Sequence, residues 1–227
     1  MLDEKASSHA SHVVALKRRA ENRTTTVFRP VIIETEEFAG FCLVRNLSPN
    51  GMMGNVYTQI VEGLPVSVRF NDDLLMRGNV MWSKNGQVGI KFDETIDVSE
   101  ILSAIGKKNV GKKVNRAPRL PIRCQGELEV DDRIYTVDVQ NISQRGLNLN
   151  AKCYLAPGQE AFVRLDGLED RKVVVRWAQN GRAGVNFIRP LGFGELAEWV
   201  IGLQSHQPSA SSAIISNERE SAGDALG

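Results

Sequence analysis

The chain has 227 residues, of which 42% are hydrophobic and 24% are charged. These ordinary globular values exclude a fully disordered, collagen-like or coiled-coil chain. The 28 Lys and Arg residues against 27 Asp and Glu give a net charge of +1, which argues against a strongly basic nucleic-acid binder. No stretch approaches the roughly 18 consecutive apolar residues of a membrane helix, and residues 1–12 lack the apolar region of a signal peptide. We therefore expect a cytoplasmic protein without membrane insertion.

An internal repeat divides the sequence. The segment from Asn46 to Gly51 recurs 95 positions later as Asn141 to Gly146, in both cases with the pattern Asn-x-Ser-x-x-Gly. Two motifs in one register indicate a tandem duplication of a unit of about 95 residues, long enough to fold as a small domain. The same shift carries Trp82, Asn85, Gly86, Gly89 and Phe92 onto Trp177, Asn180, Gly181, Gly184 and Phe187.

Taken in chain order, each unit shows a pattern of short strands. Residues 27–33 and 41–45 are rich in β-branched and aromatic side chains, and residues 66–70 alternate apolar with polar. Residues 80–83 and 88–92 flank an Asn-Gly dipeptide, which supplies the positive φ angles of a tight hairpin. The second unit repeats this pattern. Five to six such strands predict a small antiparallel barrel or sandwich.

A short helix is expected after each set of strands. Asp97 and Glu100 have the spacing of a capping box. Apolar residues follow at helical spacing, and we expect these stripes to cover a barrel end rather than to bind a partner. Residues 1–16 are expected to be a flexible N-terminus, and residues 205–227, which lack sustained periodicity, a disordered tail. The helical stripes are Val98, Ile101, Leu102 and Ile105 in the first unit, and Phe193, Leu196, Ala197 and Val200 in the second.

The cysteines and histidines argue against an enzyme. Cys42, Cys124 and Cys153 are far apart and form no Cys-x-x-Cys pair, so we interpret them as buried thiols rather than as a disulfide framework or a zinc site. The three histidines lie in polar terminal segments, which disfavours a histidine-based triad or a metal site. We expect a non-enzymatic protein without metal or cofactor.

Polar residues of two kinds could bind a ligand. Asn46, Ser48 and Gly51 form a turn that could simply shape the chain, or could present backbone N–H groups and short side chains to an anionic or purine ligand. Upstream, Arg19 and Arg23 have the spacing Arg-x-x-x-Arg. Guanidinium groups bind phosphates bidentately and can contact the O6 and N7 edge of guanine, although such basic runs are commonly just solvated.

The Arg-x-x-x-Arg segment, the Asn-x-Ser-x-x-Gly turn and the Trp hairpin ending in Gly-x-x-Phe together resemble the PilZ domain. The resemblance covers residues 17–105 and 115–204, with residues 106–114 as a basic linker. It implies a mainly β protein of two tandem six-stranded antiparallel β-barrels, each followed by a short C-terminal helix. It also implies a bacterial receptor for the second messenger cyclic di-GMP, which relays the signal to a protein partner that controls motility, exopolysaccharide or biofilm.

The resemblance further implies roles for individual residues. Arg18, Arg19 and Arg23 would hold the phosphates and guanine faces of cyclic di-GMP, and the purine side would be lined by Asn46, Ser48 and Gly51. A base could stack on Trp82, but a hairpin Trp commonly serves packing.

The second copy departs from this pattern. Allowing one gap, Arg119 matches Arg23 and Asn115 matches Arg19, while Arg116 is adjacent but out of register. The turn motif itself is intact. This domain is either a weaker nucleotide site or a scaffold for another partner. The candidate residues of the weaker site are Arg116, Arg119, Asn141, Ser143 and Gly146.

Two alternative functions remain. Both barrels could act as protein-interaction adaptors that have lost nucleotide binding. Residues 107–123 carry seven basic residues and no acidic one, which suggests contact with RNA or single-stranded DNA. We do not expect nucleic-acid binding, because the strands show no aromatic stripe on which bases could stack. The Gly-x-x-x-x-Gly-Lys match at residues 106–112 is followed by Lys113 instead of Ser or Thr and does not predict a phosphate-binding loop.

Overall fold

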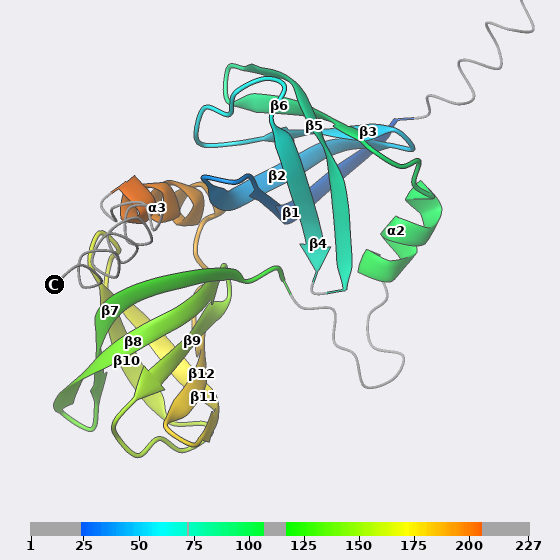
Figure 1. Ribbon diagram of the computed structural model, residues 1–227. Coiled ribbons are helices and arrows are strands. Elements are labelled where there is room, and N and C mark those ends of the chain that lie inside the picture. The colour runs from blue at the N-terminus through cyan, green and yellow to red at the C-terminus, as the bar shows by residue number, and fades with distance from the viewer. Residues whose placement is uncertain (1–23, 72, 107–116, 206–227) are drawn as a thin grey trace, which may run out of the picture.

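The computed structural model describes residues 24–71, 73–106 and 117–205. These residues form two closed six-stranded antiparallel barrels, and a helix follows each barrel (Figure 1). The mainly β fold with two tandem barrels is confirmed.

The first barrel contains β1 (Thr25–Glu34), β2 (Ala39–Ser48), β3 (Gly51–Asn55), β4 (Pro65–Asn71), β5 (Leu74–Lys84) and β6 (Gln87–Phe92). Its strand order is β1-β2-β3-β6-β5-β4, and pairing of β1 with β4 closes it. The second barrel contains β7 (Leu120–Val130), β8 (Arg133–Ser143), β9 (Gly146–Ala151), β10 (Glu160–Leu165), β11 (Arg171–Gln179) and β12 (Arg182–Phe187). Its order is β10-β11-β12-β9-β8-β7, closed by β7 with β10.

The hairpin turns have the predicted geometry. Asn85 and Gly86 have φ angles of 53° and 70°, and Asn180 and Gly181 have 52° and 73°. Asp131, with Asp132 beside it, makes a similar turn between β7 and β8, which the sequence reading did not single out. Strand β3 was not among the strands predicted, because its sequence Gly-Met-Met-Gly-Asn has no β-branched residue.

Each helix begins at an identifiable cap. Helix α2 (Val98–Gly106) follows Asp97, whose Oδ1 accepts hydrogen bonds from the N–H groups of Ser99 and Glu100. Helix α3 (Phe193–Ser205) begins after Gly192, whose N–H donates to Oε2 of Glu195 at 3.1 Å. Side chains of both helices pack on the barrel that precedes them, as predicted, with Ile101 buried in the first barrel's core cluster. In α3 the buried side chains are Leu196, Ala197, Trp199 and Val200.

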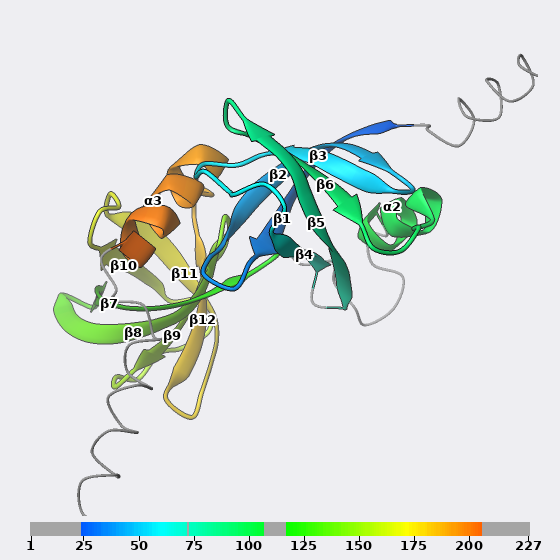
Figure 2. The ribbon, with the colours of Figure 1, turned by 45° about the horizontal axis from the view of Figure 1, so that its top comes forward.

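Helix α3 also packs against the first barrel. It lies between the two barrels in both views, whereas α2 lies on the far side of the first barrel (Figures 1 and 2). The ring of Phe193 contacts Phe41 edge-on, with centroids 6.2 Å apart, and Tyr57 at 5.9 Å. Near the other end of α3, Nε2 of Gln204 donates to the carbonyl oxygen of Ala39 at 2.6 Å. The apolar residues of α3, which we expected to cover only the second barrel, thus belong to a helix that contacts both barrels.

The outer face of the first barrel is adapted to this contact. Ile32 and Phe41 are register partners on β1 and β2, and both are buried, in the same cluster as the second barrel's core. The equivalent pair in the second barrel is Glu127 and Thr136, which are also register partners but are exposed. At these two equivalent positions, the residues are apolar in the barrel that α3 covers and polar in the other. We call the contact between α3 and the first barrel the α3 junction.

Candidate functional site

The predicted turn and the predicted Trp lie in one row across four strands. Asn46 on β2 pairs with Met53 on β3, Met53 pairs with Gly89 on β6, and Gly89 pairs with Trp82 on β5. Residues in register on adjacent strands lie side by side. The antiparallel register therefore brings together residues 36 positions apart in the chain.

The turn after β2 is held by its own serine. Oγ of Ser48 donates to the carbonyl oxygen of Gly51 at 3.0 Å. Gly51 has no positive φ, so this turn does not use the left-handed conformation that glycine permits. Glycine is needed there because a Cβ would lie 2.3 Å from the carbonyl oxygen of Ile90 on β6. The motif glycine thus permits a close approach of backbones rather than a special turn.

A cavity of about 300 Å³ lies over this row. Thr24, the residue before β1, lines it at the point where residues 17–23 join the barrel. Among the residues that the structure describes, Lys91 on β6 is the one charged lining residue, and none of the lining residues carries a carboxylate. The remaining lining residues are Asn46, Ser48, Asn50, Gly51, Met52, Met53, Met81, Trp82, Gly89 and Ile90.

Trp82 both packs and remains accessible. A Cβ on Gly89 would lie 2.1 Å from Nε1 of Trp82, so the indole rests on the glycine backbone. The side chain is nevertheless 40% exposed and lines the cavity. Packing, one of the two roles considered, is present, and stacking on a base stays a prediction.

The second barrel repeats the row with one difference. Asn141, Asn148, Gly184 and Trp177 are paired in the same order across β8, β9, β12 and β11. Asn148 occupies the position of Met53. Within the described residues, its Oδ1 is buried and has no hydrogen-bond partner, which leaves an acceptor that favours a donor group of a ligand.

One arginine of the second arm reaches its turn motif. Nη1 of Arg119 donates to Oδ1 of Asn141 at 3.1 Å, and Oγ of the buried Ser143 donates to the carbonyl oxygen of Gly146 at 3.3 Å. A Cβ on Gly146 would lie 2.0 Å from the carbonyl oxygen of Val185. Four of the five residues assigned to the weaker site therefore lie together.

The remaining predicted arginines fall elsewhere. Arg18, Arg19, Arg23 and Arg116 lie outside the described residues, as do residues 1–16, the tail from His206 and nearly all of the linker. The sequence reading missed several lining residues of the first cavity, among them Thr24, Met81 and Lys91. Lys91 and Met81 are brought there by the pairing of β5 and β6 and Thr24 by its place just before β1, and no local motif marks them.

The cysteines match the prediction in part. Cys42 is buried, but Cys124 and Cys153 are half-buried, which corrects their interpretation as buried thiols. Burial raises the pKa of Cys42 to about 12 and that of Cys124 to about 11, and it also raises the pKa of Cys153. The described residues contain no group of three or more His, Cys, Asp or Glu side chains that could hold a metal ion. Among these residues, no helix is long and apolar enough to cross a membrane.

Comparison with known proteins identifies a family. The model of the PilZ domain matches residues 17–105 and again residues 114–200. Comparison with the curated proteins gives no significant match.

The solved structures that match this chain include the following three. The PlzA protein of Borreliella burgdorferi in complex with c-di-GMP is 8% identical, with 84% of this chain and 98% of that chain covered and a TM-score of 0.33. The inhibitor of motility MotI/DgrA of Bacillus subtilis is 14% identical, with 81% and 99% covered and a TM-score of 0.33. Escherichia coli YcgR in complex with c-di-GMP is 10% identical, with 92% and 90% covered and a TM-score of 0.29.

Proposed function

We propose that this chain, which belongs to the PilZ family, is a cytoplasmic, non-enzymatic receptor that binds cyclic di-GMP at its first barrel. The observation that carries the proposal is the cavity of about 300 Å³ over the row from Asn46 to Trp82, at the strand end where the Arg-x-x-x-Arg segment enters. Such a ligand requires groups that bind its bases and groups that bind its phosphates. We propose that the barrel supplies the first and the Arg-x-x-x-Arg segment the second.

The barrel supplies groups suited to a base. The amide of Asn46 offers both a donor and an acceptor, and the exposed indole face of Trp82 offers a stacking surface. Lys91 adds a positive charge at the rim.

The arm supplies cations for the phosphates. Arg23 immediately precedes Thr24, which lines the cavity, and Arg19 is five residues from it. A chain of five residues spans at most about 18 Å, so both guanidinium groups are within reach. Bidentate bonds from arginine to phosphate combine charge with fixed geometry.

The second barrel is proposed to bind more weakly. It has the turn, the Trp and an unpaired acceptor on Asn148. However, the described arginine of its arm already donates to Asn141, and the position matching Arg19 is Asn115. This engaged arginine favours the alternative function, an adaptor that acts through protein contacts without nucleotide. In either case we propose that the output is contact with a protein partner.

Calorimetric titration of the full chain with cyclic di-GMP tests the proposal. We expect saturable heat for the wild type and a loss of affinity of about 10- to 100-fold for Arg23→Ala, because a hydrogen bond to a charged group contributes about 1.5–3 kcal/mol. Arg119→Ala should change the first site little, and Arg133→Ala, an exposed guanidinium at the start of β8, serves as the matched control. The dinucleotide should be recovered intact by chromatography.

A wild type without saturable heat would overturn the receptor proposal. A pull-down that returns the same protein with and without nucleotide would then support the adaptor.

A further inference from the structure

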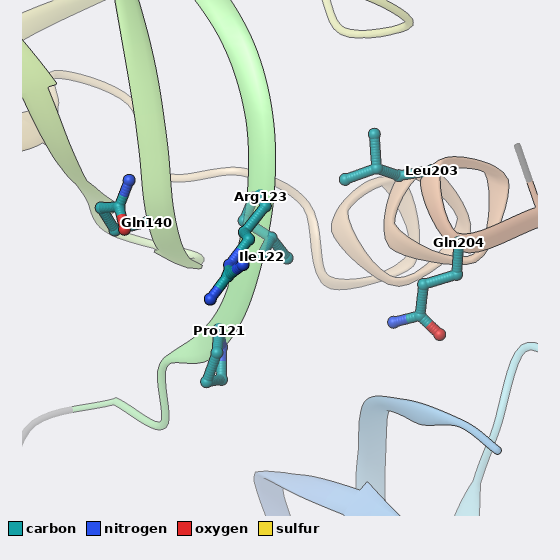
Figure 3. Close-up of a pocket in the computed structure, with 6 residues that line it drawn as sticks. All are labelled: Pro121, Ile122, Arg123, Gln140, Leu203 and Gln204. Atoms are coloured by element: carbon teal, nitrogen blue, oxygen red, sulfur yellow. The ribbon is translucent and has the colours of Figure 1, made fainter. Parts of the chain in front are cut away.

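A second cavity lies where α3 meets the second barrel. It has a volume of about 420 Å³, within the range of small-molecule sites. Figure 3 shows Leu203 and Gln204 on α3 facing, across an open space, the strand that carries Ile122 and Arg123. Pro121 and Gln140 complete the lining. These residues lie outside the row that forms the candidate nucleotide site of this barrel.

The cavity is built at two irregularities of the barrel. The register between β7 and β8 shifts between Pro121 and Cys124, and that between β8 and β9 shifts between Val139 and Asn141. Arg123 and Gln140 lie within these shifts. An extra residue in one strand, a β-bulge, turns nearby side chains out of the regular inward and outward alternation. The side chains of Arg123 and Gln140 are thereby brought to the same rim of the cavity.

The first barrel shows what fills the equivalent place. Its register shifts at the same positions, between Thr26 and Arg29 and between Val44 and Asn46. There the guanidinium of Arg45 lies over the ring of Phe28, 4.4 Å from its centroid. In the second barrel these two positions hold Gln140 and Arg123. A guanidinium is therefore retained, and the aromatic ring is missing.

The lining also defines the polarity of an occupant. Pro121, Ile122 and Leu203 offer apolar walls, Arg123 is the single charged residue, and no carboxylate is among the six. The amide of Gln204 has two N–H groups, one of which is used by Ala39 of the first barrel. The other N–H and the amide of Gln140 can donate to an anion.

We propose that this cavity binds a small, flat aromatic carboxylate. The ring of the ligand lies against the guanidinium of Arg123, as the ring of Phe28 lies against the guanidinium of Arg45 in the first barrel. The carboxylate accepts hydrogen bonds from the amides of Gln140 and Gln204. The proposal does not rest on nucleotide binding, since none of the six lining residues belongs to the row of Asn141, Asn148, Gly184 and Trp177.

Titration of the full chain with 2-naphthoate, followed by calorimetry and by amide shifts in NMR, tests this site. We expect saturable binding, at least about tenfold weaker with the neutral isostere 2-naphthamide. The double variant Arg123→Phe with Gln140→Arg installs the pair of the first barrel in the cavity and should weaken binding at least about tenfold. Arg123→Lys keeps the charge without the planar face and should lower affinity severalfold.

Two controls make the result specific. Arg133→Ala removes an exposed guanidinium of β8 outside the lining and should leave the affinity unchanged. Leu203→Trp fills the cavity from the helix side and should abolish binding even if the double variant fails to fold. Absence of saturable binding at millimolar naphthoate, or equal affinity in the wild type and Leu203→Trp, would overturn the proposal. Titration of Leu203→Trp with cyclic di-GMP should match the wild type, so the outcome is separable from the proposed receptor function.

Discussion

Replacing Phe41 with alanine tests whether the α3 junction couples the two barrels. Phe41 points out of its own barrel and is only 4% exposed because α3 covers it. Removing a buried Phe side chain costs about 3–5 kcal/mol, and the lost edge-on contact with Phe193 is part of that cost. The interior of the first barrel is left intact, so the lost free energy belongs to the junction.

The size of the thermal shift follows from chain length. For a cooperative unit of 150–250 residues, each 1 kcal/mol lowers Tm by about 2–4 °C. If the junction makes the described residues one unit, Phe41→Ala should lower Tm by about 6–20 °C and split a single calorimetric transition into two. The matched control is Thr136→Ala, at the equivalent exposed position of the second barrel, where we expect a change within about 0.5 kcal/mol.

Scanning calorimetry of both variants and the wild type provides the measurement. Two independent transitions in the wild type, or a Phe41→Ala shift no larger than that of Thr136→Ala, would refute the coupling. Phe193→Ala, which cuts the same contact from the helix side, should reproduce the effect.

The remaining predictions concern backbone approach and thiols. Gly51→Ala places a Cβ 2.3 Å from a backbone carbonyl oxygen and should lower the free energy of unfolding, measured by urea denaturation, by about 1–3 kcal/mol. Gly202→Ala lies in α3 with no atom within 4 Å of the new Cβ and should raise that free energy by about 0.5–1 kcal/mol. Equal effects of the two substitutions would contradict the packing argument. Since the thiolate is the reactive form, the pKa of about 11 at Cys124 and about 12 at Cys42 should make both react with a maleimide far more slowly than a free cysteine at pH 8, with Cys42 the slower. These folded-state pKa values lie above the unfolded value of about 8.5. The contribution of the protonated thiols to the free energy of unfolding is therefore complete below about pH 8.5 and is lost as pH rises toward 11–12. Urea midpoints that do not fall over this range would contradict this direction of the pH dependence.

The fold was predictable because its signals are local or periodic. The Asn-Gly hairpins specify their own φ angles, and the repeat of Asn46 to Gly51 at Asn141 reveals two units without knowledge of their contacts. Strand β3 could not be predicted from its own sequence because its residues have weak β propensity. It forms because it pairs with β2 on one side and β6 on the other.

The site was predictable only as far as motifs reach. Asn46, Ser48 and Trp82 were recognisable in the sequence, but Lys91 lines the cavity through strand register and Thr24 through its place just before β1. The α3 junction had no sequence signal of its own, since Ile32 and Phe41 are ordinary strand residues until a helix 150 residues later covers them. Comparison of the two copies, Ile32 and Phe41 against Glu127 and Thr136, distinguishes the covered face in the sequence.

The difference between these equivalent faces also limits assembly. A helix of one unit that packs on the strands of the preceding unit makes a head-to-tail contact. Such contacts can repeat indefinitely when every unit offers both the helix and an apolar strand face to receive it. Here the second unit offers Glu127 and Thr136 where the first offers Ile32 and Phe41. A polar outer face is how terminal repeats stop an array. A helix seated on the second barrel as α3 is seated on the first would therefore meet the carboxylate of Glu127 and the hydroxyl of Thr136.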